Sequence, residues 1–476
     1  MFAMLSETEI ADELRQQCFL NGKEKEPRVS AKAIHKLGLL YSQRKHDKIC
    51  LIQSAVLYNA ALVRGPENAE TVEKDLQNLV SDVLLIANAF KKKADIIGFS
   101  KTLRNKLVEF RRQVRIALSE IKPSGECLLG DDKHSIRSRK VKEIICCQSL
   151  VYENYVAIMK SISEYCIDVM GKAPCEYALL GLGSLAQEQI TPYSDFESAV
   201  VLEDGADENN EVLEYFRWYS VLFQLILACL QETIIRFVAI ECLNDPTRPG
   251  GDWFFDAFTP CGICSDGFAP QASKHPLGRQ RPTKSKPWTT ELIKSVSGMV
   301  RYLDSVEDLK NGYHLADVLS RTCFVDGSRD LYEKFHFESQ TKLLVSGIRG
   351  KNKLIADMEK DLKCFNAMEM LGYTFSQQLD VKRLLYRTST LFVSGLGQYL
   401  NVQSSSNFDL LDKIGATKFM TPQQISYLKY AVAISCEARL KVYMALKGQN
   451  DYVDCHPNDP SALSDLVALI GEEQFF

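Results

Sequence analysis

The chain has 476 residues, of which 46% are hydrophobic and 25% are charged, as is usual for a soluble globular protein. Ordinary domains hold roughly 100 to 200 residues, so we expect about three domains. The formal net charge is only -4, so no overall electrostatic field attracts the chain to duplex nucleic acid or to an acidic membrane. This composition favours a small substrate or a protein partner.

The cysteines and the apolar segments indicate where the protein resides. Fifteen cysteines are scattered through apolar segments, and the N-terminus lacks the basic flank and apolar core of a signal peptide. The most apolar window, Trp218 to Leu230, is shorter than the roughly 20 residues needed to cross a bilayer. We therefore expect a cytoplasmic protein with reduced cysteines and no membrane partner.

The first part of the chain is predicted to be helical. Small and aromatic residues recur at the spacing of two antiparallel helices, namely Leu37-Gly38, Tyr41, Ala55, Tyr58, Ala61 and Pro66. This spacing resembles one tetratricopeptide unit with a short insertion, and a generic helical hairpin is the alternative. A long charged helical pattern follows over residues 76–121, and residues 122–140 have the composition of a linker. We assign residues 1–140 to this region.

A strand, a turn and a second strand are predicted at the centre of the chain. They follow an amphipathic helix whose apolar residues recur at three- and four-residue spacing: Val151, Tyr155, Ile158, Ile162, Cys166 and Val169. The first strand, Tyr177 to Leu180, leads into a Gly183-Ser184 turn and a short helix. The second strand follows Asp195-Phe196-Glu197.

The remaining elements complete an α+β fold. We expect an apolar helix to about Leu230, a strand within Ile234–Leu243, an irregular stretch over residues 244–287 with short strands around Trp253–Phe258 and Gly262–Cys264, and helices from Trp288 onward. This pattern predicts a central domain with a mixed sheet over residues 141–287. A helical bundle that binds substrate is predicted over residues 288–476.

Two carboxylates carry the predicted chemistry. Asp195 and Glu197 are one residue apart and share a strand face, because side chains alternate along a strand. Paired carboxylates suit Mg²⁺, and two such ions are able to activate an attacking hydroxyl and stabilise a polyphosphate. Backbone amides of Gly183, Ser184 and Leu185, with the Ser184 hydroxyl, are predicted to hold the phosphates.

The other members of this predicted site lie further along the chain. A third metal-binding carboxylate is expected from a later segment, with Asp256, Asp266 and Glu241 as candidates. We favour Asp256, because it follows the apolar run Trp253 to Phe255. Additional positive charge for a triphosphate is available from a basic stretch, which a solvated surface loop also explains: Lys274, Arg279, Arg281, Lys284 and Lys286.

The segment GSLAQEQITPYSDFE resembles the motif of DNA polymerase β-type nucleotidyltransferases. It is most similar to the version in the N-terminal catalytic domain of the protein-PII uridylyltransferases and their relatives of unknown substrate. Residues 381–400 and 434–443 resemble, more loosely, a helical substrate-binding domain that follows in such proteins. The resemblance covers about residues 145–450 and implies a nucleoside triphosphate substrate, UTP, and a protein tyrosine as acceptor.

Two departures from this motif support an alternative function. Gln187 replaces an arginine that is able to face phosphate, and Ser198 replaces an apolar residue after the carboxylate pair. The alternative is a catalytically degenerate scaffold that binds protein partners. A third interpretation, a dinucleotide-binding oxidoreductase, rests on the glycine spacing of residues 181–186, but Pro192 interrupts the full helix that such a fold requires.

The pair Cys261-Gly-Ile-Cys264 is a single CxxC without a second pair at zinc-finger spacing. We interpret its cysteines as small buried residues.

Overall fold

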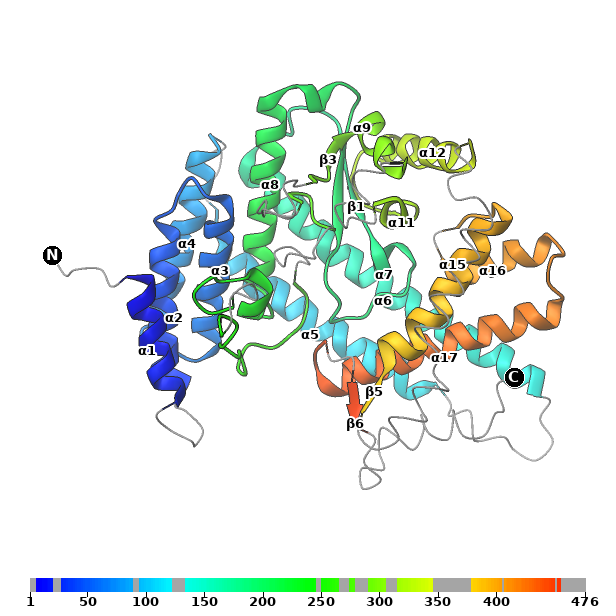
Figure 1. Ribbon diagram of the computed structural model, residues 1–476, viewed down its shortest axis with the longest axis horizontal. Helices are drawn as coiled ribbons and strands as arrows, with labels where there is room; N and C mark the ends of the chain where they lie inside the picture. The colour runs from blue at the N-terminus through cyan, green and yellow to red at the C-terminus, as the bar shows by residue number, and fades with distance from the viewer. Residues whose placement is uncertain are drawn as a thin grey trace.

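The computed structural model describes eleven stretches of the chain: residues 6–19, 27–88, 94–121, 133–244, 250–264, 274–278, 290–304, 315–345, 378–404, 406–449 and 452–454. The structure has helical regions on both sides of a small central sheet (Figure 1). None of the helices within these ranges is both long and apolar enough to span a bilayer.

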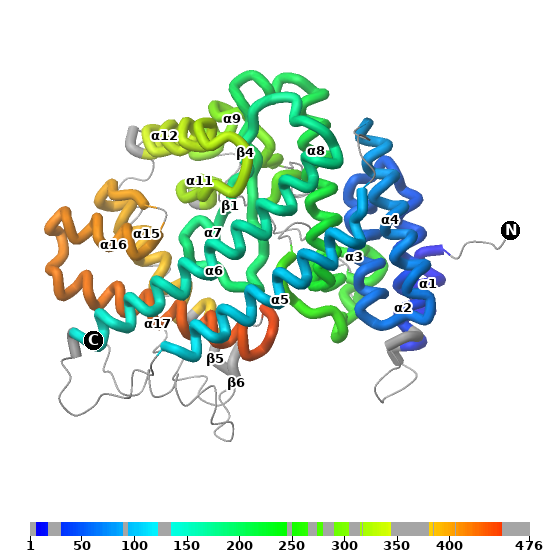
Figure 2. Tube along the Cα trace, turned by 180° about the vertical axis from the view of Figure 1, so that it is seen from behind, coloured from blue at the N-terminus to red at the C-terminus, as the bar shows by residue number. Residues whose placement is uncertain are grey.

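Within the described ranges, six helices precede the sheet: α1 (Glu7–Phe19), α2 (Pro27–Ser42), α3 (Lys48–Val63), α4 (Ala69–Ile86), α5 (Ile96–Glu120) and α6 (Lys133–Met170). Helices α2 and α3 form the predicted hairpin and pack closely. A Cβ atom on Gly38 would lie 2.7 Å from the Tyr58 ring, so this approach requires a glycine. The helices α5 and α6 cross behind the sheet and reach the C-terminal helices (Figure 2).

The sheet has the strand order β3-β2-β1-β4. Its strands are β1 (Tyr177–Gly181), β2 (Ser198–Leu202), β3 (Ile293–Ser295) and β4 (Cys323–Gly327). Strand β1 is antiparallel to both β2 and β4, and β2 is parallel to β3. The sheet is therefore mixed, as predicted.

Alternation of side chains divides the sheet between two cores. Leu179, Val200 and Leu202 join the large core, which contains α6 and α8 (Asn210–Ala228). Leu180 and Val201 join a smaller core on the other face. The helices of this second layer are α9 (Val296–Arg301), α11 (Leu315–Leu319) and α12 (Arg329–Val345). Both faces are covered, which explains why all five residues of β2 are buried.

Several predicted elements are confirmed and others are wrong. The first central strand, the strand after the carboxylates and the apolar helix α8 are present. The strand expected within Ile234–Leu243 is wrong, because Ile235–Val238 forms a 3-10 turn. The short strands expected around residues 253–258 and 262–264 do not form as regular strands. The Phe196 amide nevertheless donates a hydrogen bond to the Cys264 carbonyl.

The segment after Trp288 is not entirely helical, because β3 and β4 lie within it. The predicted division at residue 287 therefore separates two of the four sheet strands from the other two. Periodicity in such short strands is too brief to be distinguished from a helical pattern.

The antiparallel pairing of β1 with β2 also bears on the oxidoreductase interpretation. A dinucleotide-binding unit joins parallel strands through a full helix. Here the connection contains only the one-turn helix α7 (Gly183–Ala186), and the strands run in opposite directions. The oxidoreductase interpretation is therefore wrong.

The C-terminal helices are α15 (Thr388–Leu400), α16 (Asn407–Ala416) and α17 (Pro422–Leu446), preceded by a π-helical turn, Lys382–Arg387, and a strand, β5 (Gln378–Asp380). Helix α17 begins at a capping box in which Thr421 and Gln424 satisfy each other's backbone amides, with Pro422 in the first turn. Strand β5 pairs with β6 (Tyr452–Asp454).

A buried ion pair joins α17 to α6. Lys140 Nζ lies 2.8 Å from Glu437 Oε1, and their side chains are only 4% and 2% exposed. Lys441 also contacts the same Glu437 oxygen at 3.0 Å. A buried charge of this kind requires its partner, because desolvation is costly.

We expect Glu437→Ala to lower the free energy of unfolding by roughly 3–5 kcal/mol, because Lys140 would stay buried without this carboxylate. Urea denaturation measures the loss. The double change Lys140→Met/Glu437→Leu should recover most of it, since no buried charge is then left. The exposed pair Lys160–Glu164 supplies a control, and Glu164→Ala should change little.

Candidate functional site

The Gly-Ser turn follows β1 directly and depends on two glycines. A Cβ atom on Gly181 would lie 2.6 Å from Leu185 and 2.7 Å from the Cys323 sulfur. Gly183 has a φ of +59°, a conformation that disfavours any residue with a side chain. Ser184 is partly exposed, whereas the Leu185 side chain is buried in the core. Leu185 is therefore able to contact a ligand only through its backbone.

The two carboxylates lie immediately before β2, beside this turn. Asp195 and Glu197 are partly exposed, while Phe196 between them is buried. The Glu197 carboxylate lies so close to the Gly183 backbone that a Cβ atom there would overlap it. The Leu182 amide also donates to the Glu197 carbonyl at 2.9 Å. The structure thus places both acids on one face and aims Glu197 at the turn.

Internal donors contact both carboxylates. Lys274 Nζ lies 2.9 Å from Glu197 Oε1. Asp195 Oδ1 accepts a hydrogen bond from the Cys264 thiol at 2.8 Å and a second one from the Gln449 side-chain amide. These donors come from three separate segments of the chain. The negative charge of the two carboxylates is therefore partly compensated by donors of the protein itself.

Burial raises the pKa of the Asp195 carboxyl above its ordinary value of 3.8. The hydrogen bonds from Cys264 and Gln449 oppose this rise, and the negative charge of Glu197 adds to it. Ionising Asp195 therefore costs more in the folded protein than in the unfolded chain. A carboxylate that costs stability at neutral pH is more typical of a functional site than of a structural one.

The favoured third carboxylate lies in a different environment. Asp256 forms an ion pair with Arg64 at 2.6 Å, and both side chains are almost fully buried. It also accepts a backbone hydrogen bond from Thr259 at 3.1 Å. Within the described part of the chain, no three His, Cys, Asp or Glu side chains gather as a metal cluster. Asp256 therefore stabilises the packing of α3, and the prediction that it joins the pair finds no support.

The other predicted residues have different outcomes. Glu241 is exposed on a turn. Asp266, Arg279, Arg281, Lys284 and Lys286 lie outside the described residues. Of the basic stretch, the structure describes Lys274, and it reaches Glu197.

Lys274 belongs to a short segment whose position is fixed by buried contacts. The Leu277 amide donates to His275 Nδ1 at 3.1 Å, and burial lowers the pKa of His275 to about 3. His275 is therefore neutral at physiological pH. The Ser198 amide donates to the Lys274 carbonyl at 3.0 Å, which holds this segment beside β2.

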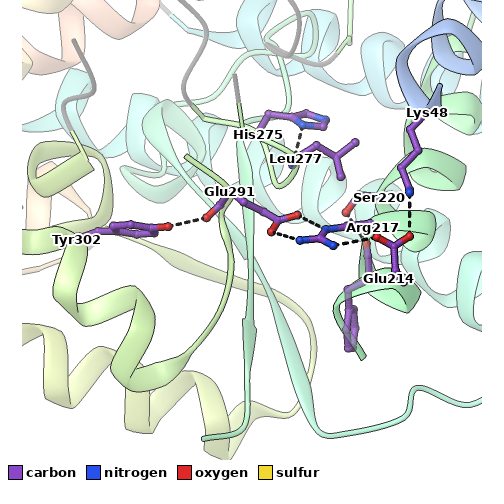
Figure 3. Close-up of polar contacts among 9 residues, drawn as sticks. Lys48, Glu214, Arg217, Ser220, His275, Leu277, Glu291 and Tyr302 are labelled. Carbon is purple, nitrogen blue, oxygen red and sulfur yellow. Dashed lines mark hydrogen bonds and ion pairs between the residues drawn. The ribbon is translucent and has the colours of Figure 1, made fainter. Parts of the chain in front are cut away.

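An ion-pair network joins α8 to Glu291 (Figure 3). The next residue, Leu292, donates its amide to the Pro276 carbonyl of this segment at 2.8 Å. Arg217 binds both oxygens of Glu291 at 2.7 and 2.9 Å and also contacts Glu214. Lys48 on α3 completes the network through Glu214 at 2.8 Å. The network therefore links the N-terminal helices to residues beside β3.

Two arginines, Arg439 buried and Arg111 partly buried, hold the loop between the turn and the carboxylates. Arg439 on α17 donates to the Gln189 carbonyl and to Ser194 Oγ, each at 3.2 Å. Arg111 on α5 donates to the Pro192 carbonyl at 2.9 Å, and its guanidinium lies over the Tyr193 ring. The loop is therefore held by helices from both ends of the chain.

The sequence analysis missed Gln449 and the two arginines, and it interpreted Cys264 only as a buried residue. Cys264 is indeed buried, but its thiol also contacts Asp195. Arg439 lies in the segment 434–443 that resembles a substrate-binding domain, which was the one available signal for it. No local pattern marks Gln449, because its contact spans 254 positions in the sequence.

We expect Gly183→Ala to destabilise the protein more than Gly205→Ala. Both glycines have positive φ, +59° and +82°, so each alanine should incur the left-handed penalty of roughly 1–2 kcal/mol. Only the Cβ at position 183 would also overlap Glu197, since a Cβ at position 205 would have no heavy atom within 4 Å apart from its chain neighbours. Equal urea midpoints for the two variants would contradict this account of the turn.

We expect Asp195→Asn to stabilise the protein at pH 7. Because the folded-state pKa of Asp195 is raised, its contribution to stability is fully present below 3.8 and is lost as pH rises through the folded-state value. Each pH unit between the folded and unfolded pKa values corresponds to about 1.4 kcal/mol. The gain in urea midpoint should shrink as pH falls toward 3.8. The exposed Asp330→Asn is the control, and a pH-independent gain at position 195 would refute the prediction.

The comparisons with known proteins concern the same part of the chain. The family model described as "Putative nucleotidyltransferase DUF294" matches residues 137–231. This stretch contains most of α6, the Gly-Ser turn, both carboxylates and α8. No curated protein matches the chain. The central segment is therefore similar to a nucleotidyltransferase domain.

Proposed function

We propose that the protein transfers a nucleoside monophosphate from a nucleoside triphosphate to an acceptor hydroxyl. A bond forms between the acceptor oxygen and the α-phosphorus, the bond to the β-phosphate oxygen breaks, and pyrophosphate leaves. The observation that carries this proposal is the Glu197 carboxylate lying against the Gly183 turn, with Asp195 on the same face. The family match over residues 137–231 supports it.

The donor set fits a hard cation. Asp195 and Glu197 supply carboxylate oxygens, which Mg²⁺ prefers, and both side chains are partly exposed. When bound, Mg²⁺ supplies charge neutralisation for the triphosphate and activation of the acceptor hydroxyl. Two ions are expected for this chemistry. Asp266 and Glu241 stay candidates for the third metal-binding carboxylate.

Ser184 and Lys274 are proposed to contact the phosphates. Ser184 is partly exposed at the turn that Glu197 faces. The Lys274 ammonium is already within 2.9 Å of Glu197, so it lies beside the acids that would hold the cations. Arg279 is a further proposed phosphate ligand from the stretch after this segment.

The resemblance to uridylyltransferases suggests UTP as the nucleotide and a tyrosine of a protein as the acceptor. Base choice depends on the shape of the pocket, which neither carboxylate determines. The arginine contacts of α5 and α17 to the loop of residues 189–194 place both helical regions beside the site. These regions are therefore the proposed surface for a protein acceptor.

A scaffold without catalysis is the second candidate. Three observations favour it: Gln187 stands where an arginine is usual, Asp256 pairs with Arg64, and internal donors contact both carboxylates. A scaffold has no use for an acid whose ionisation costs more in the folded protein than in the unfolded chain, and Asp195 is such an acid. That cost favours the enzyme.

Calorimetry with each nucleoside triphosphate, with and without Mg²⁺, separates the two candidates. We expect Mg²⁺-dependent binding by the wild type, and we expect the double change Asp195→Asn/Glu197→Gln to abolish it by removing both cation ligands. The control is Asp330→Asn/Glu333→Gln, which removes two exposed charges from α12. Weak binding that is the same in all three proteins would support the scaffold.

A further inference from the structure

The end of α17 turns back toward the proposed cation site. Lys447 has a left-handed conformation with a φ of 52°, and the Gly448 amide donates to the Tyr443 carbonyl at 3.2 Å. This turn directs Gln449 away from the helix axis. We refer to residues 448–449 as the strap.

Two hydrogen bonds hold the strap against the segment that contains the CxxC pair, and a third joins it to Asp195. The Gln449 backbone amide donates to the Cys261 carbonyl at 2.7 Å. Its side-chain amide donates to the Gly262 carbonyl at 3.0 Å and to Asp195 Oδ1. A Cβ atom on residue 448 would lie 2.9 Å from the Cys261 carbonyl, so a glycine suits this close approach. The contact is therefore specific.

The strap donates to a carboxylate oxygen that a cation bound at Asp195 is also able to use. A carboxylate oxygen has two lone pairs, and Asp195 Oδ1 accepts from both Cys264 and Gln449. A cation that binds this oxygen must displace at least one of these donors. The Gln449 amide is the less constrained of the two, because it reaches the site from the end of a helix, whereas Cys264 is buried beside Phe196.

We propose that the strap is an autoinhibitory contact: Gln449 restricts cation binding at Asp195, and cation binding releases the strap. This inference rests on the proposed function, because it concerns the same cation site. Thermodynamic linkage requires the effect to be reciprocal. A variant without the Gln449 amide binds the cation more tightly, and the bound cation weakens the hold on residues 448–449.

Release of the strap would also affect strands β5 and β6. Strand β6 follows three residues after Gln449 and pairs with β5 through Asp380↔Tyr452 and Leu379↔Val453. Strand β5 leads into the π-helical turn that contains Lys382, whose charge lowers the pKa of Asp195. Along the chain, the strap therefore lies between α17 and strand β6 of this ladder.

The test is calorimetric titration of the full chain with Mg²⁺ and with Mn²⁺, in the absence of nucleotide. A hydrogen bond to a charged group contributes about 1.5–3 kcal/mol, so we expect Gln449→Ala to bind the cation about tenfold more tightly or better. The control is Gln423→Ala, an exposed glutamine in the first turn of α17, which should bind as the wild type does.

A second measurement does not depend on affinity. Hydrogen exchange of the Gln449 backbone amide, which bonds to Cys261, should become faster in the wild type when the cation is added. The amides in the middle of α17 should not change. This result distinguishes release of the strap from a general loosening of the helix.

The outcomes separate this inference from the proposed function. Unchanged affinity in Gln449→Ala, with binding abolished in Asp195→Asn, would overturn the strap and leave the cation site intact. Weaker binding in Gln449→Ala would also overturn it and would make the amide a ligand. Absence of cation binding in both the wild type and Gln449→Ala would overturn the strap and the cation site together.

Discussion

The contact between the Glu197 carboxylate and the backbone of Gly183 is the constraint on which the proposed site depends. It is possible because Gly183 has neither a side chain nor a preference against positive φ. Strand β1 ends at Gly181, two residues before this glycine, and β2 begins one residue after Glu197, so antiparallel pairing brings the two points together. The turn and the acids are thus positioned by the sheet rather than by a loop alone.

Helices that lie before and after the central segment also hold the loop between the turn and the acids. Backbone carbonyls in the loop of residues 189–194 accept from Arg111 on α5 and from Arg439 on α17. Side-chain contacts continue this anchoring, since Asn407 on α16 donates to the Gln189 side chain at 2.9 Å. Residues outside the segment that the family model matches therefore help to hold the loop of this segment in place.

The sequence predicted those elements whose apolar and polar residues follow a regular local pattern. The apolar run before Gly183, the alternation at Asp195-Phe196-Glu197 and the apolar helix α8 are visible in the sequence and present in the fold. Strands β3 and β4 were not predicted, because three to five residues carry little periodicity and their pairing with β2 and β1 is long-range. Asp256 was misplaced for a related reason: Arg64, its partner, is 192 positions away.

The electrostatics of the site follow from the same long-range contacts. Two acids in a partly buried position repel each other, and the chain offsets this with Lys274 at one and with Cys264 and Gln449 at the other. Gln449 follows the end of α17, a helix that is fixed to α6 through Lys140 and Glu437. The buried pair that fixes α17 therefore also positions a donor at the site. The end of α17 is in this way coupled to the charge of Asp195, which is the physical basis for the proposed response of the C-terminal region to a cation.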